Sequence, residues 1–264
     1  MYSRLPPIYS NQIKYLTMAA RKPVLILQLR PEDTTSDSEY ACILKYGRLQ
    51  PRDTIRKRIE QQGIPDELNP EDYSAIIVGG SPFDISTPQD SKSGIQKKIE
   101  VDFNRLLGQV VTLDFPFLGA CSGNGLLGNY LGTSISTKYG EAVECVTLDI
   151  TDAGKQDKLL RGFPDQIDVL LGHKEAVDTL PKGATLLMTG SGCPVQMFRI
   201  GENVYATQFH PEGDAEEFIL RINTYRNHGY FEPHEADELK RRVNLKTTPH
   251  AQKILRRFVE RYYR

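Results

Sequence analysis

Cysteine is scarce in this sequence of 264 residues, which contains only four of them. They are Cys42, Cys121, Cys145 and Cys193, which are widely spaced and form no CxxC pair. This spacing argues against a disulfide framework and against a zinc site, and it favours a reducing compartment. We expect Cys42, Cys145 and Cys193 to be packing residues.

Long apolar runs are absent as well. No segment is long enough to span a membrane, and no basic-then-apolar leader with a small-residue cleavage site begins the sequence. The 33 Lys and Arg residues nearly balance the 34 Asp and Glu residues, which leaves a formal net charge of −1. We therefore expect a cytoplasmic protein with no membrane partner and no nucleic-acid partner.

The remaining composition is typical of one large α/β domain with appendages. The continuous apolar run at residues 24–29 predicts a central strand that is buried on both faces. Further strands are predicted at residues 54–60, 73–78, 115–118, 141–149, 168–171, 185–189, 195–200 and 204–209. Helices are predicted at residues 39–49, 95–107 and 215–227, and two more after residue 229. The polar segments 31–38, 83–93 and 151–164 are predicted to be loops, and the second of them is a candidate mobile flap.

The predicted strand 115–118 is followed by small residues and then by a helical pattern, with Cys121 between Gly119 and Gly123. This arrangement is typical of a nucleophile elbow, in which a sharp strand-to-helix turn lifts the nucleophile off the sheet. Glycines flank such a turn because two stretches of backbone approach each other closely there. We therefore predict that Cys121 is presented at a helix N-terminus and not packed in the core.

A presented cysteine needs help to ionise. A free thiol with a pKa near 8.5 is only roughly 3% ionised at neutral pH, and lowering the pKa to about 6.5 takes roughly 2.7 kcal/mol. A helix N-terminus supplies at best about 2 kcal/mol, so we expect a base nearby. The predicted strand 204–209 delivers His210, and Glu212 follows where its carboxylate can orient the imidazole. The candidate catalytic triad is Cys121, His210 and Glu212.

The two motifs together resemble a known family. Gly119-Ala-Cys-Ser-Gly123 is followed, about 90 residues later, by Gln208-Phe-His-Pro-Glu212. Motifs of this kind in this order are similar to those of class I (triad) glutamine amidotransferases, such as the glutaminase domain of GMP synthase. The order also separates the sequence from α/β-hydrolases, in which the acid precedes the histidine.

The resemblance covers about residues 24–227 and implies a fold. We expect a flavodoxin-like, three-layer α/β/α architecture with a central, mostly parallel sheet and a small antiparallel strand extension. The chain would then consist of an N-terminal extension at residues 1–22, an amidotransferase-like domain at residues 23–228 and a C-terminal helical extension at residues 229–264.

The resemblance also assigns roles to further residues. The N–H groups of Gly80 and Ser122 would form the oxyanion hole. Ser81 departs from the family here, because it stands where proline usually follows the glycine pair. His173 and Glu175 would contact the amino-acid head group of the substrate, and a solvated turn is the other interpretation of their segment.

The implied reaction is attack by the Cys121 thiolate on the γ-amide of glutamine or of a γ-glutamyl compound. His210 would protonate the leaving amine and then activate water against the γ-glutamyl thioester, and no metal or organic cofactor is needed. The sequence departs from the family at Gly125, where a glutamine usually helps to hold the substrate. Small residues at Gly123, Gly125 and Gly128 predict unusual room beside the nucleophile.

Several functions remain open at this point. One is a self-sufficient hydrolase of small-molecule γ-glutamyl amides. Another is a glutaminase subunit that delivers ammonia to a separate synthetase partner, which an exposed apolar patch near the elbow would favour. A third is a non-catalytic, amidotransferase-like binding protein. A DJ-1-like cysteine protein shares the elbow but is not expected to carry His-Pro-Glu.

Overall fold

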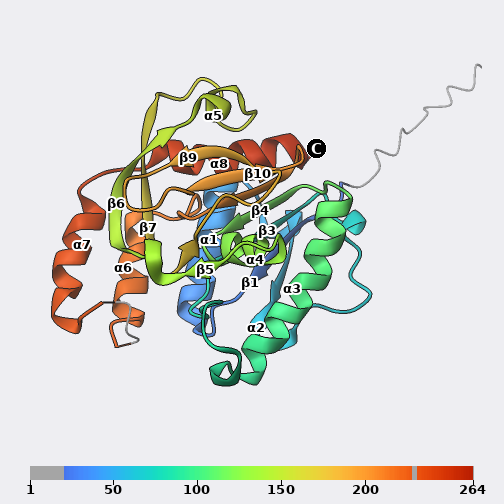
Figure 1. The fold of residues 1–264 in the computed structure, drawn as a ribbon, viewed down its shortest axis with the longest axis horizontal. Coiled ribbons are helices and arrows are strands. Elements are labelled where there is room, and N and C mark those ends of the chain that lie inside the picture. The colour runs from blue at the N-terminus through green and yellow to red at the C-terminus, as the bar shows by residue number, and fades with distance from the viewer. Residues whose placement is uncertain (1–20, 228–230, 264) are drawn as a thin grey trace, which may run out of the picture.

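The computed structural model describes residues 21–227 and 231–263, and this part of the chain forms three layers around one large sheet (Figure 1). Nine of the described strands form that sheet in the order β2-β1-β3-β4-β11-β10-β9-β6-β7. They are β1 (Val24–Gln28), β2 (Thr54–Arg58), β3 (Ala75–Val78), β4 (Phe117–Ala120), β6 (Glu141–Ile150), β7 (Gln166–His173), β9 (Thr185–Thr189), β10 (Met197–Ile200) and β11 (Val204–Thr207). Neighbours from β2 to β11 pair in parallel, and neighbours from β11 to β7 pair antiparallel. The predicted fold class is confirmed.

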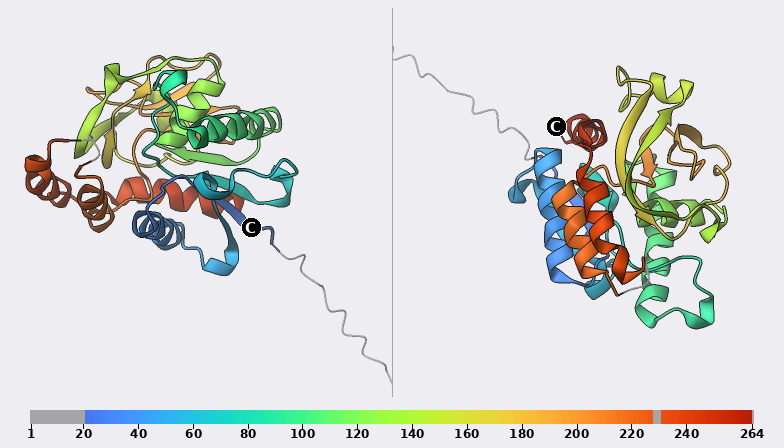
Figure 2. Two further views of the ribbon diagram at one scale, coloured as in Figure 1. Left: turned by 90° about the horizontal axis from the view of Figure 1, so that it is seen from below. Right: turned by 90° about the vertical axis from the view of Figure 1, so that its left-hand side faces the viewer.

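Helices cover both faces of the sheet (Figure 2). They are α1 (Asp33–Gly47), α2 (Ile59–Gln62), α3 (Gly94–Thr112), α4 (Ser122–Tyr130), α5 (Asp152–Gln156), α6 (Ala215–Thr224), α7 (Ala236–Asn244) and α8 (Pro249–Tyr262). The buried side chains of α1 and α8 join Val24 and Ile26 in one core, and those of α3 and α4 join Leu25 and Leu27 in the other. Successive residues of β1 point into opposite cores, which is why the strand is apolar from Val24 to Leu27.

Three local predictions are wrong. α1 begins at Asp33, inside the segment predicted as a loop, and an acidic residue at this end interacts favourably with the helix dipole. β2 ends at Arg58 and α2 follows at once, where a strand to residue 60 is predicted. The predicted loop 151–164 contains α5, whose first turn is capped because Thr151 accepts a hydrogen bond from the N–H of Gly154.

Both predicted helices of the C-terminal extension pack on the domain. The apolar face of α8 is buried in the core that it shares with α1, and α7 packs against α6. Another pair of short strands, β5 (Ile135–Ser136) and β8 (Ala176–Val177), forms a second sheet. The domain division stays a proposal, because residues 228–230 and all but the last two residues of the extension 1–22 lie outside the described residues.

The described ranges contain neither a candidate membrane span nor a candidate metal cluster. No helix within 21–227 and 231–263 has the length and apolar character of a membrane span. Within the same ranges, no three His, Cys, Asp or Glu side chains are grouped as a metal site requires.

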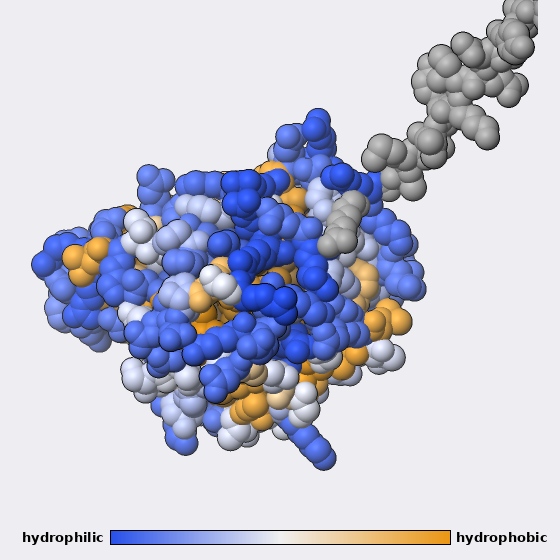
Figure 3. All heavy atoms as spheres, turned by 90° about the horizontal axis from the view of Figure 1, so that it is seen from above, coloured by the Kyte–Doolittle hydropathy of each residue, from blue (hydrophilic) through white to orange (hydrophobic). Residues whose placement is uncertain are grey.

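On the face that Figure 3 shows, hydrophilic residues predominate and hydrophobic ones gather in smaller patches.

Candidate active site

Cys121 lies at the corner between β4 and α4, as predicted. Its backbone has a φ of 51° and a ψ of −96°. A non-glycine residue rarely adopts a positive φ, and nucleophile elbows are known for such strained turns. A Cβ atom at position 119 would come within 2.7 Å of the carbonyl group of Gly123, so the turn requires Gly119. The predicted elbow geometry is confirmed.

His210 and Glu212 follow β11, which pairs in parallel with β4. Because the carboxyl ends of parallel strands meet at one edge of a sheet, Cys121 and His210 come to the same place. Nδ1 of His210 lies 2.6 Å from Oε1 of Glu212, and each side chain is only 3% exposed. We assign the proton to Nδ1, since the carboxylate can only accept, and this leaves Nε2 as the acceptor.

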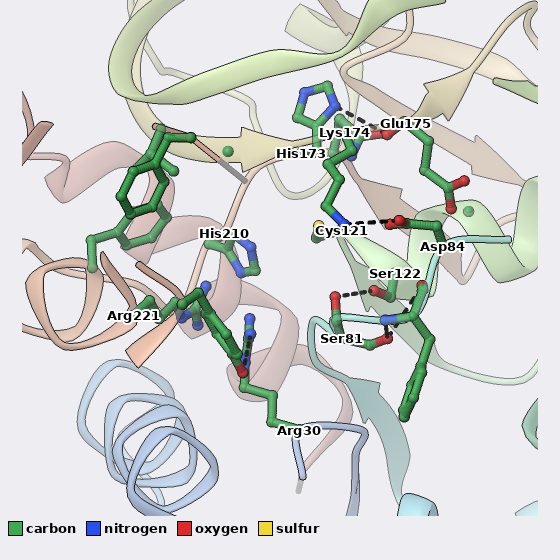
Figure 4. A pocket seen from close by; sticks show the side chains of 18 of the residues that line it. Arg30, Ser81, Asp84, Cys121, Ser122, His173, Lys174, Glu175, His210 and Arg221 are labelled. Carbon is green, nitrogen blue, oxygen red and sulfur yellow. Dashed lines mark hydrogen bonds and ion pairs between the residues drawn. The ribbon is translucent and has the colours of Figure 1, made fainter. Parts of the chain in front are cut away.

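Cys121 and His210 line one pocket of about 760 Å³, a volume that includes the solvent at its mouth (Figure 4). Its charged lining residues include Arg30, Asp84, Lys174, Glu175 and Arg221. Its apolar lining residues include Phe83, Ile135, Val143, Phe218, Ile222 and Phe231. In the described part of the chain no hydrogen bond joins Sγ of Cys121 to His210. Such bonds often tighten only when substrate binds.

Burial and neighbouring charges together set the protonation states of the candidate triad. Burial raises the pKa of the Cys121 thiol to about 11, against the opposing effect of Arg30 and Arg221. It lowers the pKa of His210 to about 4, with Arg221 acting in the same direction and Glu212 in the opposite one. Burial opposes ionisation of Glu212 too, but His210 and Arg221 hold its pKa below the usual range. In this arrangement the thiol and the base are both neutral, so the shift of the thiol pKa is opposite in direction to the lowering that the sequence analysis expects.

The two predicted oxyanion donors, Ser122 and Gly80, differ in their surroundings. Ser122 is the first residue of α4 and lines the pocket beside Cys121. The N–H of Gly80 donates instead to Oε1 of Glu39, at 3.1 Å. Gly80 is nevertheless close to the candidate base, because a Cβ atom there would come within 2.8 Å of Cε1 of His210. The oxyanion role stays a prediction, and for Gly80 it requires exchange of the bond to Glu39.

His173 and Glu175 line the pocket, and both have protein partners. His173 is buried, with Nε2 3.0 Å from Oε2 of Glu141 and Nδ1 3.1 Å from the carbonyl oxygen of Glu175. The Glu175 carboxylate accepts the N–H groups of Ile85 and Ser86 in the predicted flap, at 2.6 and 2.7 Å. The solvated-turn interpretation is therefore wrong for His173. Contact of either residue with substrate stays a prediction.

The predicted flap approaches Gly125 through one side chain, that of Ile85. A Cβ atom at this position would come within 2.9 Å of Cδ1 of Ile85. One turn further along α4, a Cβ atom at Gly128 would come within 2.7 Å of Cγ2 of Val177. Gly125 itself lines the pocket, so room remains on that side of it. At Gly128 the prediction of unusual room is wrong, because Val177 packs closely against α4 there.

The sequence analysis missed a cluster of buried charged residues next to His210. Arg30 and Arg221 line the pocket, and Glu39 forms ion pairs with both. Arg221 could have been noticed in the sequence, because it lies four residues after Glu217 on the face of α6 that packs inward. A charged pair on a face predicted to be buried indicates a specific role. Arg30 and Glu39 have no comparable signal.

Comparison with known proteins identifies relatives of this chain. Residues 52–222 match the family described as Glutamine amidotransferase class-I. A subunit of the glutamine-hydrolyzing GMP synthase of Methanothermobacter thermautotrophicus is 30% identical over 148 residues, which cover 56% of this chain and 69% of that protein. Gamma-glutamyl peptidase 3 of Arabidopsis thaliana is 27% identical over 191 residues, which cover 69% of this chain and 72% of that protein.

A solved structure shares the fold. A glutamine amidotransferase from Thermotoga maritima matches with a TM-score of 0.66 and 22% identity, covering 90% of this chain and 98% of that one. The family match at residues 52–222 spans more than half of the chain and contains the elbow as well as His210 and Glu212. This chain therefore belongs to the class I glutamine amidotransferase family.

Proposed function

We propose that this protein is an enzyme that cleaves the γ-amide of glutamine or of a γ-glutamyl compound through a cysteine thioester. One observation carries the proposal: Cys121, at the strained corner of the elbow, shares a pocket with His210, whose Nδ1 is paired with Glu212. These three residues are the proposed triad. The names of the relatives support it, since one belongs to a glutamine-hydrolyzing GMP synthase and the other is a gamma-glutamyl peptidase.

In the proposed reaction, Nε2 of His210 takes the thiol proton as Sγ of Cys121 attacks the γ-carbonyl carbon. His210 then gives this proton to the leaving nitrogen, which departs as ammonia or an amine and leaves a γ-glutamyl thioester. Water attacks the thioester and loses a proton to His210. That proton returns to sulfur as the acid product leaves. Glu212 stays ionised and stabilises the imidazolium in both steps.

The resting protonation states favour general-base catalysis. Burial raises the thiol pKa of Cys121 and lowers the pKa of His210, so we expect the thiolate to form during attack and not before it. The proposed oxyanion donors are the N–H of Ser122 and, after it leaves Glu39, that of Gly80. The proposed steps use no metal ion and no organic cofactor.

Amide release by the isolated chain tests the proposal. The panel consists of free glutamine, γ-glutamyl dipeptides and a γ-glutamyl anilide, and the product measured is ammonia or the free amine. Turnover of at least one compound, lost in a folded Cys121→Ala variant, would support the proposed reaction. If the folded wild-type protein turns over none of them, the hydrolase proposal fails.

A glutaminase subunit of a separate synthetase is the second candidate function. It is supported by the similarity to a GMP synthase subunit. In the described ranges, however, none of the exposed large apolar side chains lines the pocket. They are Ile55, Ile95, Val101, Leu113, Leu180 and Leu245. We therefore favour a self-sufficient hydrolase over a glutaminase subunit. Glutaminase activity that appears only when an amidating enzyme is added would favour the subunit instead.

Gly125→Gln tests how the flap shapes specificity. Its Cβ atom would lie 2.9 Å from Cδ1 of Ile85, so we expect the single variant to lower hydrolysis of every amide tested. Adding Ile85→Ala makes room for the glutamine side chain. One new hydrogen bond to substrate should then raise kcat/KM for free glutamine by about two- to twelve-fold over Ile85→Ala alone.

The four proteins of this double-mutant cycle are compared by kcat/KM on free glutamine and on a γ-glutamyl dipeptide. The wild type and Ile85→Ala are the matched controls for the two glutamine variants. A gain on glutamine from Gly125→Gln alone would contradict the prediction, because it would show that Ile85 does not oppose the added side chain.

A further inference from the structure

The cluster next to His210 joins parts of the site that are far apart in the sequence. We propose that Arg221, together with Glu39, is a positioning residue that holds Glu212, and through it the imidazole of His210, against the loop that carries Gly80. This inference rests on the proposed function, since it takes His210 to be the base.

The contacts form a chain of polar interactions around the imidazole. Nη2 of Arg221 lies 3.2 Å from Oε1 of Glu212, the same oxygen that lies 2.6 Å from Nδ1 of His210. The same Nη2 lies 3.5 Å from Oε1 of Glu39, which accepts the N–H of Gly80 at 3.1 Å. Gly80 lies close to the imidazole ring, since a Cβ atom at this position would come within 2.8 Å of Cε1 of His210. The polar contacts therefore run from the imidazole through Glu212, Arg221 and Glu39 to Gly80, which lies close to the same ring.

Each charged member of this path is buried. The exposed fractions are 0% for Glu39, 3% for Glu212 and 7% for Arg221. Arg30 also pairs with Glu39, at 2.9 Å. A Cβ atom at Gly79 would come within 2.3 Å of Oε2 of Glu39, so the glycine pair makes room for this carboxylate. Because an unpaired buried charge is costly, the two arginines and the carboxylates of Glu39 and Glu212 hold each other in place.

Glu212 needs external support because it lies in a turn that follows β11 and not in a helix or strand. The support comes from two helices, with Arg221 on α6 and Glu39 on α1. In Figure 4, Arg30 and Arg221 lie beside His210, whereas Lys174 and Asp84 lie on the other side of Cys121. The arginines can therefore support the base without closing the space in front of the nucleophile.

The charged groups that act on His210 are Glu212 from its own loop, Arg221 from α6 and Arg30 from the segment after β1. Arg221 is also paired with the buried Glu217 on its own helix. After burial, Arg221 is the next cause that lowers the pKa of His210, and Glu212 raises it. Arg221 also opposes the effect of burial on the Cys121 thiol. Loss of the Arg221 charge should therefore raise both pKa values. A loosened, water-filled site would instead lower the thiol pKa, since burial would be relieved.

Three variants separate geometry from charge. Arg221→Lys keeps the positive charge but cannot present a planar fork to several carboxylates, Arg221→Met removes the charge, and Glu39→Gln keeps the size of the side chain. We expect kcat to fall about 10- to 100-fold in each, with KM within about two-fold, because a misplaced base costs rate and not substrate binding. Arg241→Met, on a side chain that is 75% exposed, is the matched control and should leave kcat unchanged.

Alkylation of Cys121 by iodoacetamide as a function of pH gives a readout that needs no substrate. We expect the profile to move to higher pH in Arg221→Met and to stay in place in Arg221→Lys. The acid limb of kcat/KM should also move to higher pH in Arg221→Met.

The proposal is overturned if folded Arg221→Lys and Glu39→Gln both keep kcat within about two-fold of the wild type. It is also overturned if the alkylation profile of Arg221→Met moves to lower pH. If Arg221→Met does not fold, the other two variants decide. If the wild type hydrolyses no amide, the proposed function fails, and the alkylation profiles alone decide the role of Arg221.

Discussion

Replacing Cys121 with alanine is expected to reduce amide hydrolysis by about 10⁴-fold or more, to the background of the assay. Without the thiol no thioester can form, and the remaining base can only assist a slow direct attack by water. The change removes one sulfur atom from the pocket lining and should not unfold the protein. Product release is compared with wild type at equal folded fraction, measured by circular dichroism.

A chloroketone analogue of glutamine should label Cys121 and spare the other cysteines. Thiol acidity does not select it, because burial also raises the pKa of Cys42 to about 12 and those of Cys145 and Cys193 to about 11. Cys121 differs because it lines the pocket together with His210. Cys145 is half-buried, so Cys145→Ala is the matched control and should keep both labelling and activity. Label found by mass mapping on Cys145 with Cys121 untouched would contradict the triad.

His210→Ala is expected to lower kcat by about 10³- to 10⁴-fold, and Glu212→Gln by about 10²-fold. The imidazole moves a proton in both half-reactions, whereas the carboxylate orients the ring and stabilises its charged form. The amide of Glu212→Gln can still accept a hydrogen bond from Nδ1, but it no longer offers a charge to Arg221. Equal and complete loss in two folded variants would assign Glu212 a different role.

The acid limb of kcat/KM should move in opposite directions in Glu212→Gln and in Arg221→Met, because Glu212 raises the pKa of His210 and Arg221 lowers it. Activity requires neutral His210, whose pKa is lowered to about 4, so kcat/KM should persist from neutral pH and fall as the pH drops through about 4. Glu212 raises this pKa, so Glu212→Gln should move the acid limb to lower pH. The folded pKa of Glu212 is itself lowered, and the stability it contributes is present above its unfolded pKa and lost as pH falls through the folded one. Circular dichroism at each pH separates the two effects.

Strands, helices and the residues of the proposed triad could be predicted where they depend on residues that are adjacent in the sequence. Residues 24–27 are apolar because both faces of the strand are covered, and Gly119 is present because the elbow brings two backbones together. The start of α1 could not be predicted in this way, since polar side chains in its first turns are buried by contacts from distant segments. Thr35, for example, is buried and contacts Tyr225.

The sequence by itself determined the resemblance to the family, the buried strands and the nucleophile elbow, because each depends on short motifs and their order. Only the tertiary structure decided the surroundings of these groups. Glu39 and Arg221 form an ion pair although they are 182 positions apart in the sequence. Ile85 lies beside Gly125 although 40 positions separate them. Desolvation and charge interactions act through space, so the protonation states of Cys121 and its base follow from neighbours that no local pattern places beside them.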